Sequence, residues 1–427
     1  MDSSVTAIKP GLLIDGLGGA PKQGYSALLK GERILWVGPQ DQLSSHHEFG
    51  NPDDASDNHQ VLELPEATLL PGLIDCHTHT NMPGDGRTGE EIARESDDIR
   101  LLRSARNARR ALESGVTTMC DCGSWNRTAF SLKEGIRLGL ADGPTVLVSG
   151  PPLTVTGGHL WFMGGEADGV DGVRRQVRYL LKQGADFIKV AASGGSTLTS
   201  YPYRPSLSVD EIKAITEEAH NRGKPVAAHC RSTASINHAM DGGVDLILHC
   251  FFTDTEGNYI FDEPTAERLA AAETWVNPTH YIGKPRQIEL LQKQEQGVLT
   301  AEDSAMLDRI EVGERNRIDR FQRLTKMGVR LIGGSDCGWG SYQFGDFQGE
   351  IMSMTEFGLS PMEAILAGTR DAATALGKLA NIGTIEAGKQ ADLLLVEGNP
   401  IEDIAALRRV KTVFHGGRRV TGPIGPG

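Results

Sequence analysis

Apolar residues along the chain gather in short runs that alternate with longer stretches in which apolar positions recur at helical spacing. Runs of this length indicate buried strands, and the longer stretches indicate amphipathic helices. The alternation starts at the apolar run Leu69–Ile74 and continues to about residue 380. The pattern therefore predicts an α/β fold in which strands and helices follow one another through the middle of the chain.

Eight strands can be counted in this middle part, each followed by a helix or a loop. After Leu69–Ile74 come seven further runs: Val116–Asp121, Thr145–Ser149, Phe187–Val190, Val226–His229, Leu246–His249, Trp275–Pro278 and Val329–Asp336. The clearest helices are expected at Val173–Gln183, Val209–Arg222, residues 300–327 and Pro361–Leu376. This order is typical of a (β/α)8 TIM barrel. A doubly wound parallel sheet is the alternative, but the regular spacing of the strands favours closure.

Both ends of the chain are predicted to contain short strands joined by turns. Residues Lys30–Arg33 give a hairpin signal, and Gly416-Gly417 gives a turn. The flanking strands are expected at Ser26–Leu29, Ile34–Val37, Ala391–Val396 and Val410–Phe414. We therefore expect residues 1–66 and 381–427 to form one small composite β-sandwich domain, with residues 67–380 forming the catalytic barrel.

Composition narrows the class of protein. The 427 residues carry a formal net charge of −13, and 39% are hydrophobic and 23% charged, which is ordinary for a globular protein. No basic patch is visible, so we expect no nucleic-acid partner. No apolar run reaches the length of a membrane span, so we expect no membrane insertion.

Cysteine usage and the N-terminus bear on the compartment. Six cysteines in a chain of this length are not a disulfide framework, and free buried thiols suit a reducing compartment. The start Met1–Ser4 lacks the basic and apolar regions of a signal peptide. We expect a cytoplasmic protein, although a leader cleaved from a precursor would leave no trace in this sequence.

Polar residues with metal-binding side chains stand at the ends of the predicted strands. In a barrel of this kind the carboxyl ends of the strands meet at one mouth. Side chains two residues apart on a strand point the same way, so His77 and His79 can present two imidazoles to one ion. Any single member has a structural alternative, such as a hydrogen-bonded histidine or a helix-capping aspartate. The full set of strand-end residues is His77, His79, Lys189, His229, His249 and Asp336.

Lys189 is the unusual member because it lies between the apolar residues Ile188 and Val190. A buried lysine tends to lose its proton. Its structural alternative is an ion pair with a neighbouring acid. The functional interpretation of Lys189 is a neutral amine that reacts with carbon dioxide to give a carbamate. The spacing of the residues alone does not establish this modification.

The chain resembles the amidohydrolase superfamily, binuclear metal type. The matching segments are Leu70–His79, Ile188–Val190, Ala228–His229, Leu248–His249, Gly333–Asp336 and Gly383–Leu393. Finer features are similar to the imidazolonepropionase-like branch, which includes Xaa-Pro dipeptidases and ochratoxinase-like amidases. These features are Ala191–Gly195, Asp241–Asp245 and Gly398–Ile404.

The resemblance implies a role for each strand-end residue. His77, His79 and Asp336 would hold one divalent ion, and His229 and His249 a second. Lys189, as N6-carboxylysine, would bridge the two ions together with a hydroxide. Asp336 would take the proton of the attacking hydroxide and deliver it to the leaving amine. Zinc is the default metal for this ligand set, and manganese or cobalt would also fit.

The resemblance also bears on the reaction and on the assembly. Mononuclear deaminases of the superfamily usually carry a glutamate where this chain has Ser232, so deamination is disfavoured. Non-catalytic assembly relatives typically lack metal ligands, and all six are present here. The branch often forms higher assemblies, so we expect a homo-oligomer that acts on a small-molecule amide.

Residues in the predicted mouth loops suggest the substrate. Aromatic residues cluster there, which indicates either an apolar pocket or loop packing: Trp161, Phe162, Phe251, Phe252, Trp339, Tyr342, Phe344 and Phe347. The polar candidates for substrate binding are His159, Tyr203, Arg231 and His280. Arg231 is the best chemical fit to a carboxylate.

These features favour hydrolysis of the amide bond between an acyl or aroyl group and an apolar amino acid. N-acyl amino acids, dipeptides and ochratoxin A-type amides fit, in a carboxypeptidase-like reaction. A cyclic amide or lactone hydrolase of the same superfamily is the alternative.

Overall fold

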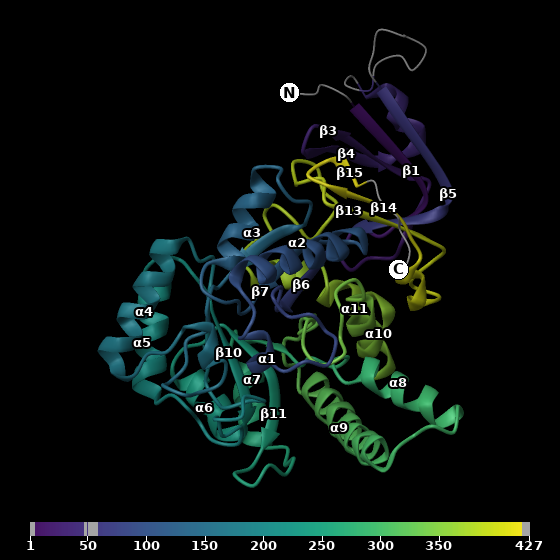
Figure 1. Ribbon diagram of the computed structural model, residues 1–427. Coiled ribbons are helices and arrows are strands. Elements are labelled where there is room, and N and C mark those ends of the chain that lie inside the picture. Colours follow the sequence, from purple (N-terminus) through teal and green to yellow (C-terminus); the bar gives the residue numbers. More distant parts are fainter. Residues whose placement is uncertain (1–4, 47–48, 50–58, 421–427) are drawn as a thin grey trace. The chain divides into compact units, whose positions relative to one another are not determined.

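A computed structural model describes residues 5–46, 49 and 59–420 of the chain (Figure 1). The chain divides into two compact units. The first contains the residues up to Ile74, residues 109–118 and the residues from Gly345 onward. The second contains Asp75–Ala108 and Met119–Phe344, and it holds all six predicted metal ligands.

Strands from both ends of the chain share one sheet in the first unit. Its order is β15-β14-β13-β5-β1-β3-β4, with β2 paired to β1 (Figure 1). The central pairing joins β5 to β13 in antiparallel fashion, from Leu393 opposite Pro71 to Glu397 opposite Ala67. The strand bounds are β1 (Val5–Leu13), β2 (Lys22–Gln23), β3 (Tyr25–Lys30), β4 (Arg33–Pro39), β5 (His59–Pro71), β13 (Leu393–Glu397), β14 (Val410–His415) and β15 (Arg418–Arg419).

The predicted turns at both ends of the chain are confirmed. Lys30 pairs with Arg33 across the hairpin of β3 and β4, and His415 pairs with Arg418 across Gly416-Gly417. Apolar side chains from both ends pack together beside this sheet, including Ile8, Leu29, Leu69, Leu393 and Phe414. Burial of such side chains removes apolar surface from water, which is the main force that holds the two ends together. The domain limits at residues 66 and 381 stay a prediction.

The helices of the first unit correct one expectation. The helix predicted at Pro361–Leu376 is two helices, α11 (Pro361–Ala367) and α12 (Arg370–Ala375). Thr369 between them has φ −138° and ψ −93°, which is outside the helical region. The remaining helical elements of this unit are α10 (Gln348–Glu356), η1 (Gln40–Ser45) and η3 (Ile404–Arg408).

Seven strands lead toward the predicted ligands, in two sheets. The first sheet has the order β6-β7-β8, and the second has the order β12-β11-β10-β9 with parallel pairing. The boundary between the two compact units falls within β6 and within β7. The strand bounds are β6 (Leu73–Thr78), β7 (Val116–Asp121), β8 (Thr145–Val148), β9 (Ile188–Ala191), β10 (Val226–Ser232), β11 (Leu246–Thr253) and β12 (Trp275–Asn277).

The first predicted strand, Leu69–Ile74, is divided between two strands. Leu69–Pro71 end β5, and a separate strand β6 begins at Leu73. Gly72 lies between them, where a Cβ atom would be only 2.2 Å from the hydroxyl of Thr117. This close approach requires glycine, and the change of strand occurs there. An apolar run alone does not reveal such a division.

The eighth predicted strand, Val329–Asp336, is not a regular strand. Isolated bridges pair Leu331 with Val276 and Cys337 with Thr78. A third isolated bridge pairs Leu153 with Val190. The segment departs from strand geometry because Asp336 has φ +56° and because the Asn277 side chain bonds the carbonyl oxygens of Ile332 and Gly334.

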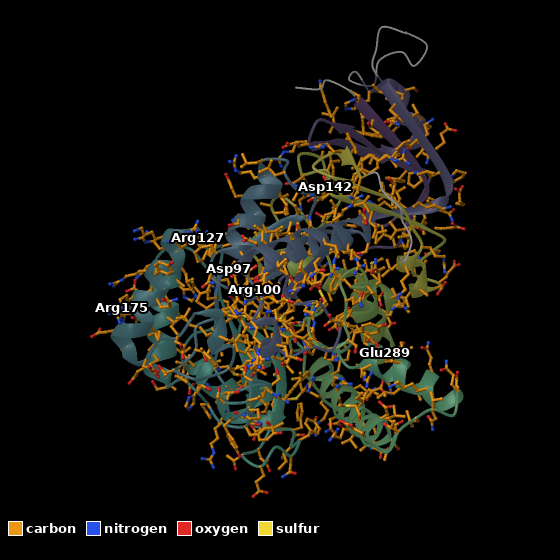
Figure 2. The ribbon with its side chains drawn as sticks, in the orientation of Figure 1. Asp97, Arg100, Arg127, Asp142, Arg175 and Glu289 are labelled. Carbon is orange, nitrogen blue, oxygen red and sulfur yellow. The ribbon has the colours of Figure 1, made fainter. Side chains whose placement is uncertain are left out.

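Helices follow most of these strands, as the periodicity predicts. Capping boxes begin α5 at Ser208 and α9 at Thr300, and each satisfies backbone N–H groups that would otherwise lack partners. Arg100 of α2 donates a hydrogen bond to Asp97 at 2.6 Å, and Figure 2 labels both residues. The guanidinium of Arg100 also lies over the ring of Trp125. The helix bounds are α1 (Gly89–Ile92), α2 (Asp97–Glu113), α3 (Thr128–Arg137), η2 (Trp161–Met163), α4 (Gly169–Gln183), α5 (Val209–His220), α6 (Thr233–Asp241), α7 (Glu263–Ala271), α8 (Lys284–Glu295) and α9 (Ala301–Lys326). Among the described residues, no helix combines the length and the apolar character that a membrane crossing requires.

Candidate metal centre

The end of β6 presents the two histidines of the His-x-His motif. His77 is the fifth residue of this fully buried strand, and His79 follows it by two residues. Their ring centroids are 5.5 Å apart, and both side chains are buried. The alternation of a strand therefore brings both imidazoles to one point, as the sequence predicts.

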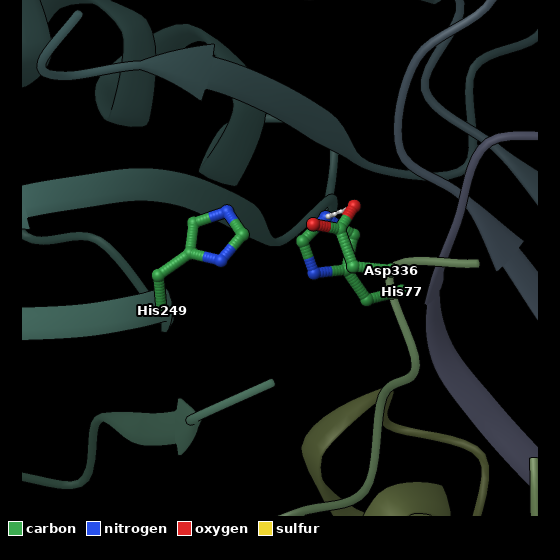
Figure 3. Close-up of side chains that lie close together, drawn as sticks. All are labelled: His77, His249 and Asp336. Atoms are coloured by element: carbon green, nitrogen blue, oxygen red, sulfur yellow. Dashed lines mark ion pairs between the residues drawn. The ribbon is translucent and has the colours of Figure 1, made fainter. Parts of the chain in front are cut away.

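Asp336 joins these histidines from a distant part of the chain. Its Oδ1 lies 3.3 Å from Nε2 of His77 and 3.3 Å from Nε2 of His79. Figure 3 shows the pair that it makes with His77, with His249 nearby. The preceding residue, Ser335, donates to the carboxylate of Asp75 from its backbone N–H at 2.9 Å and from its hydroxyl at 2.5 Å. These bonds fix the segment that carries Asp336 against the strand that carries His77.

Lys189 of β9 points into the same cluster. Its Nζ lies 3.5 Å from Nε2 of His77, and the side chain is almost fully buried. Burial lowers the pKa of Lys189, because the interior disfavours its charged form. The charges of Cys122 and Asp336 raise the pKa of Lys189 in part, so an ion pair with a neighbouring acid stays an alternative for this residue.

His229 of β10 and His249 of β11 complete the group. Their ring centroids are 4.5 Å apart, and the ring of His249 is 5.2 Å from that of His77. Potential ligand atoms of His77, His249 and Asp336 all lie within 4.8 Å of one another. The geometry therefore brings all six predicted residues into one buried cluster.

Hydrogen bonds outside the cluster orient each imidazole. His79 Nδ1 is 3.0 Å from the carbonyl oxygen of Gly123, and His229 Nε2 is 3.1 Å from that of Gly194. A carbonyl can only accept, so each of these ring nitrogens carries the proton, and the opposite nitrogen keeps its lone pair. His249 Nδ1 lies 3.0 Å from the hydroxyl of Thr279, and His77 Nδ1 lies 3.1 Å from the side-chain oxygen of Asn277. Such outer partners are typical of metal-binding histidines.

The protonation states also suit metal binding. Burial lowers the pKa of His77, His229 and His249 well below the usual histidine value, and neighbouring cationic groups lower it further. The imidazoles are therefore neutral near pH 7, which is the form that binds a metal. Four imidazoles, one carboxylate and one buried amine form a donor set that fits borderline divalent cations such as zinc.

Two of the predicted substrate residues lie beside the His229–His249 pair. The ring of His159 is 4.5 Å from that of His229, and its Nδ1 is 2.9 Å from the hydroxyl of Thr197. The guanidinium of Arg231 lies over the ring of Phe251, which itself is 5.5 Å from the ring of His249. Burial lowers the pKa of Arg231, and its buried Nε has no hydrogen-bond partner in the described part of the chain.

The other two predicted substrate residues lie in different surroundings. Tyr203 packs edge-on against Tyr201 and beside Gly257, and its charge interaction with Arg231 places it near that residue. The ring of His280 packs against that of Phe321 of α9 at 4.5 Å; burial lowers the pKa of His280, and the charges of Arg320 and Arg317 lower it further. The structure thus groups His280 with α9, and its role in substrate binding stays a prediction.

The aromatic cluster expected at the mouth divides into two groups. Phe252, Tyr342, Phe344 and Phe347 are buried, as expected for loop packing. Trp339 and Phe162 remain partly exposed, and the ring of Trp339 is 5.5 Å from that of His79 in an edge-on contact. Phe251 is also partly exposed, and its ring is 5.5 Å from that of His249, while Trp161 is exposed.

Sequence reasoning missed the residues that orient the ligands. Asn277 and Thr279 hold His77 and His249, and neither was a candidate. One signal was available for Asn277, because it stands at the end of a predicted strand as the ligands do. No motif marks Gly123, and Gly194 lies in the Ala191–Gly195 feature but was given no role there; both act through backbone carbonyl groups.

The buried imidazole–carboxylate cluster in this α/β fold is a donor set that could hold a divalent metal ion. The sequence model of the amidohydrolase family matches residues 68–420, and the chain belongs to this family. It is 28% identical over 460 aligned positions to ochratoxinase of Aspergillus niger, covering 100% of this chain and 88% of that protein. It is 24% identical to imidazolonepropionase of Agrobacterium fabrum, covering 90% and 86% of the two chains.

Solved structures are similar over nearly the whole chain. A Xaa-Pro dipeptidase with methionine bound in its active site has a TM-score of 0.82 and 26% sequence identity, covering 98% of this chain and 100% of that one. The protein is therefore an amidohydrolase, an enzyme of amide-bond hydrolysis from a family that typically depends on metal ions.

Proposed function

We propose that this enzyme cleaves the amide bond between an acyl or aroyl group and an apolar amino acid, with two divalent metal ions in its site. One observation carries the proposal: a buried cluster of six potential ligands lies beside Arg231, a partly buried guanidinium whose Nε has no hydrogen-bond partner among the residues that the structure describes. The similarity to ochratoxinase and to a Xaa-Pro dipeptidase supports the same reaction class.

The metal ligands would divide into two sets. His77, His79 and Asp336 would hold one ion, and His229 and His249 the other, with zinc as the expected metal. Two bound ions would supply an activated water and would polarise the carbonyl group of the substrate. The surrounding residues bind and orient the ions, and the burial of the cluster excludes bulk water.

Lys189 would be carboxylated. Its burial favours the neutral amine, and a neutral amine can add to carbon dioxide to give a carbamate with release of one proton. The product, N6-carboxylysine, would add a negative charge and two oxygen atoms between the imidazoles. This charge would offset part of the charge of two divalent ions in a buried site.

Asp336 would move the proton of the reaction. Its carboxylate lies beside the two histidines of the first set, where it can accept a proton from the attacking water and return it to the departing amine. Transfer to nitrogen is required because an amide cleaves readily only when the leaving amine becomes protonated. The hydrogen bonds from Ser335 to Asp75 would hold the carboxylate of the neighbouring Asp336 in position during this transfer.

Arg231 would bind the carboxylate of the amino-acid part of the substrate. A guanidinium matches a carboxylate in a two-point contact, and such a contact would satisfy the buried Nε. The ring of His159 lies 4.5 Å from the imidazole of His229, where His159 would be a further polar contact for the substrate. Tyr203 and His280 stay further candidates, while Trp339 and Phe162 would meet the apolar acyl group beside His79.

The arrangement of the strands supports a closed barrel. Bridges from Leu153 to Val190, from Val276 to Leu331 and from Thr78 to Cys337 connect the edges of the two sheets, with the segment of Leu331 and Cys337 in the eighth position. We therefore retain the (β/α)8 TIM barrel as a proposal, together with the composite β domain of residues 1–66 and 381–427. A homo-oligomer and a cytoplasmic location also stay proposals; the six free, buried cysteines support a reducing compartment.

A hydrolysis panel on the zinc-loaded protein tests the proposed reaction. The panel contains N-acyl-L-amino acids, Xaa-Pro dipeptides, ochratoxin A and a matched series in which the carboxylate is blocked as an amide. We expect release of a free apolar amino acid that stops when a chelator removes the metal. Release from the blocked series at an equal rate would contradict the role of the carboxylate.

A cyclic amide or lactone hydrolase is the second candidate within the same family. Hydantoin-type rings and simple lactones belong in the same panel. Turnover of these rings without release of amino acids from the linear amides would favour the second candidate and overturn the first.

A further inference from the structure

Asn277 makes three side-chain hydrogen bonds at the point where β12 ends. It is fully buried, and its side chain reaches two other parts of the chain. Nδ2 donates to the carbonyl oxygens of Ile332 at 3.3 Å and Gly334 at 2.9 Å, while Oδ1 lies 3.1 Å from Nδ1 of His77. Every polar atom of this amide is therefore used, and each bond concerns a segment that carries a metal-ligand candidate.

The two carbonyl contacts fix the orientation of the amide. Carbonyl oxygens accept only, so the NH2 group must face Ile332 and Gly334, and the oxygen must face His77. Oδ1 can only accept, so Nδ1 of His77 carries the ring proton. Nε2 then keeps its lone pair, and this nitrogen is the one that lies 3.3 Å from Asp336 and 3.5 Å from Lys189.

The Asn277 amide also binds the segment Val329–Asp336 where this segment no longer pairs through its backbone. Backbone bonds join Val276 to Arg330 and Ile332, and beyond them the Asn277 side chain takes over. The contact is tight: a Cβ atom on Gly334 would lie 2.7–2.8 Å from the Asn277 amide atoms. Asp336 is two residues further on, and its N–H donates to the carbonyl of His77 at 2.6 Å.

We propose that Asn277 is a positioning residue that sets the ring orientation of His77 and the location of Asp336 together. This inference rests on the proposed metal site and extends it to a residue outside the ligand set. A leucine of similar size would lose all three bonds. An aspartate would keep the acceptor for His77 but would place a negative oxygen against two carbonyl oxygens.

Loss of the Asn277 amide should affect one of the two proposed metal positions and not the other. Asn277 touches the ring of His77 and the segment of Asp336, which both belong to the first ligand set. His229 and His249 are held by other partners, Gly194 and Thr279. Loss of the amide should therefore weaken the first metal position and spare the second.

The test is a calorimetric titration of metal-free protein with Zn²⁺, compared between wild type, Asn277→Leu and Asn237→Leu. Asn237 is the control, because its partly buried amide also makes three hydrogen bonds, yet it lies on α6 and contacts Thr233, Thr265 and Arg268. For Asn277→Leu we expect one of the two binding steps to weaken by about tenfold to hundredfold, as is typical when an outer partner of a ligand is removed. The other step, and both steps of Asn237→Leu, should stay unchanged.

A second variant guards against simple misfolding. Gly334→Ala should displace the Asn277 amide and weaken the same zinc-binding step. In an Asn277→Ala background, where the smaller side chain leaves space, Gly334→Ala should lower the zinc affinity little further. Additive losses, unchanged binding in Asn277→Leu, or equal weakening of both steps would each overturn the inference. A wild-type protein that binds no zinc would instead overturn the proposed metal site, and with it this inference.

Discussion

Asp336 and His77 are joined twice, once through the backbone and once through their side chains. The N–H of Asp336 donates to the carbonyl of His77 at 2.6 Å, and the carboxylate lies 3.3 Å from Nε2 of the same histidine. Asp336 adopts a φ of +56°, which is rare outside glycine and is found mostly where the surrounding structure enforces it. The pair therefore depends on a conformation that the neighbouring bonds maintain.

Replacing Asp336 by Asn should nearly abolish amide hydrolysis. The amide side chain keeps the shape but accepts no proton near pH 7, and general base catalysis contributes about a hundredfold to ten-thousandfold. We expect kcat to fall by at least this factor, measured with the best substrate of the panel. Metal content should be measured in the same sample, and a variant with full metal and activity within tenfold of wild type would contradict the proton-transfer role.

Removing Lys189 should make metal loading independent of carbon dioxide. Metal-free wild-type protein should bind zinc more completely when bicarbonate is present, because the carbamate must form before it can bridge two ions. Lys189→Ala should bind fewer ions and show no response to bicarbonate. A ¹³C signal of a carbamate in wild type after incubation with labelled bicarbonate is the direct measurement, and its absence in fully loaded protein would exclude carboxylation.

Arg231→Ala should discriminate between substrates with and without a free carboxylate. A hydrogen bond to a charged group contributes about 1.5–3 kcal/mol, which corresponds to about tenfold to hundredfold in kcat/KM. We expect this loss for N-acyl amino acids and little change for their carboxamide analogues. Arg231→Lys is the matched variant, because it keeps the charge and loses the two-point contact. An equal loss for both substrate types would contradict the carboxylate role.

The cysteines should be unreactive in the folded protein. All six are free and buried, and burial raises the pKa of Cys250 to about 12 and that of Cys122 and Cys337 well above the usual thiol value. A hydrogen bond with Cys76, together with burial, raises the pKa of Cys120 in the same way. A raised pKa means that the reactive thiolate is scarce near pH 8. We expect no labelling by a thiol reagent before unfolding and six labels per chain in denaturant. Rapid labelling of the native protein would show that the site region opens more readily than the structure indicates.

Sequence patterns located the ligands because strands have a fixed period. Short apolar runs that contain Lys189 or end in His229 and His249 predicted where β9, β10 and β11 lie, and the geometry brings the three residues into one cluster, although β10 and β11 continue three and four residues past their histidines. Because neighbouring parallel strands run in the same direction, residues at equivalent positions of different strands lie close together in the fold, so their positions in the sequence predict a common site. The strand-rich ends of the chain were predicted for the same reason.

The errors arose where side chains replace backbone pairing or where strands change partners. The run Leu69–Ile74 is uniformly apolar, so its division at Gly72 has no signal in periodicity. Val329–Asp336 has the composition of a strand, yet the Asn277 amide takes the place of a backbone partner there. The surroundings of His280 depend on the packing of α9, which no local pattern reveals.

The central claim is that amide hydrolysis depends on two metal ions held by one buried cluster. The most direct measurement adds zinc in known amounts to metal-free protein and follows the initial rate of amino-acid release. The account predicts a rate that is negligible without metal, rises with added zinc and reaches its plateau at two equivalents per chain. A rate that persists in metal-free protein, or a plateau at one equivalent, would contradict it.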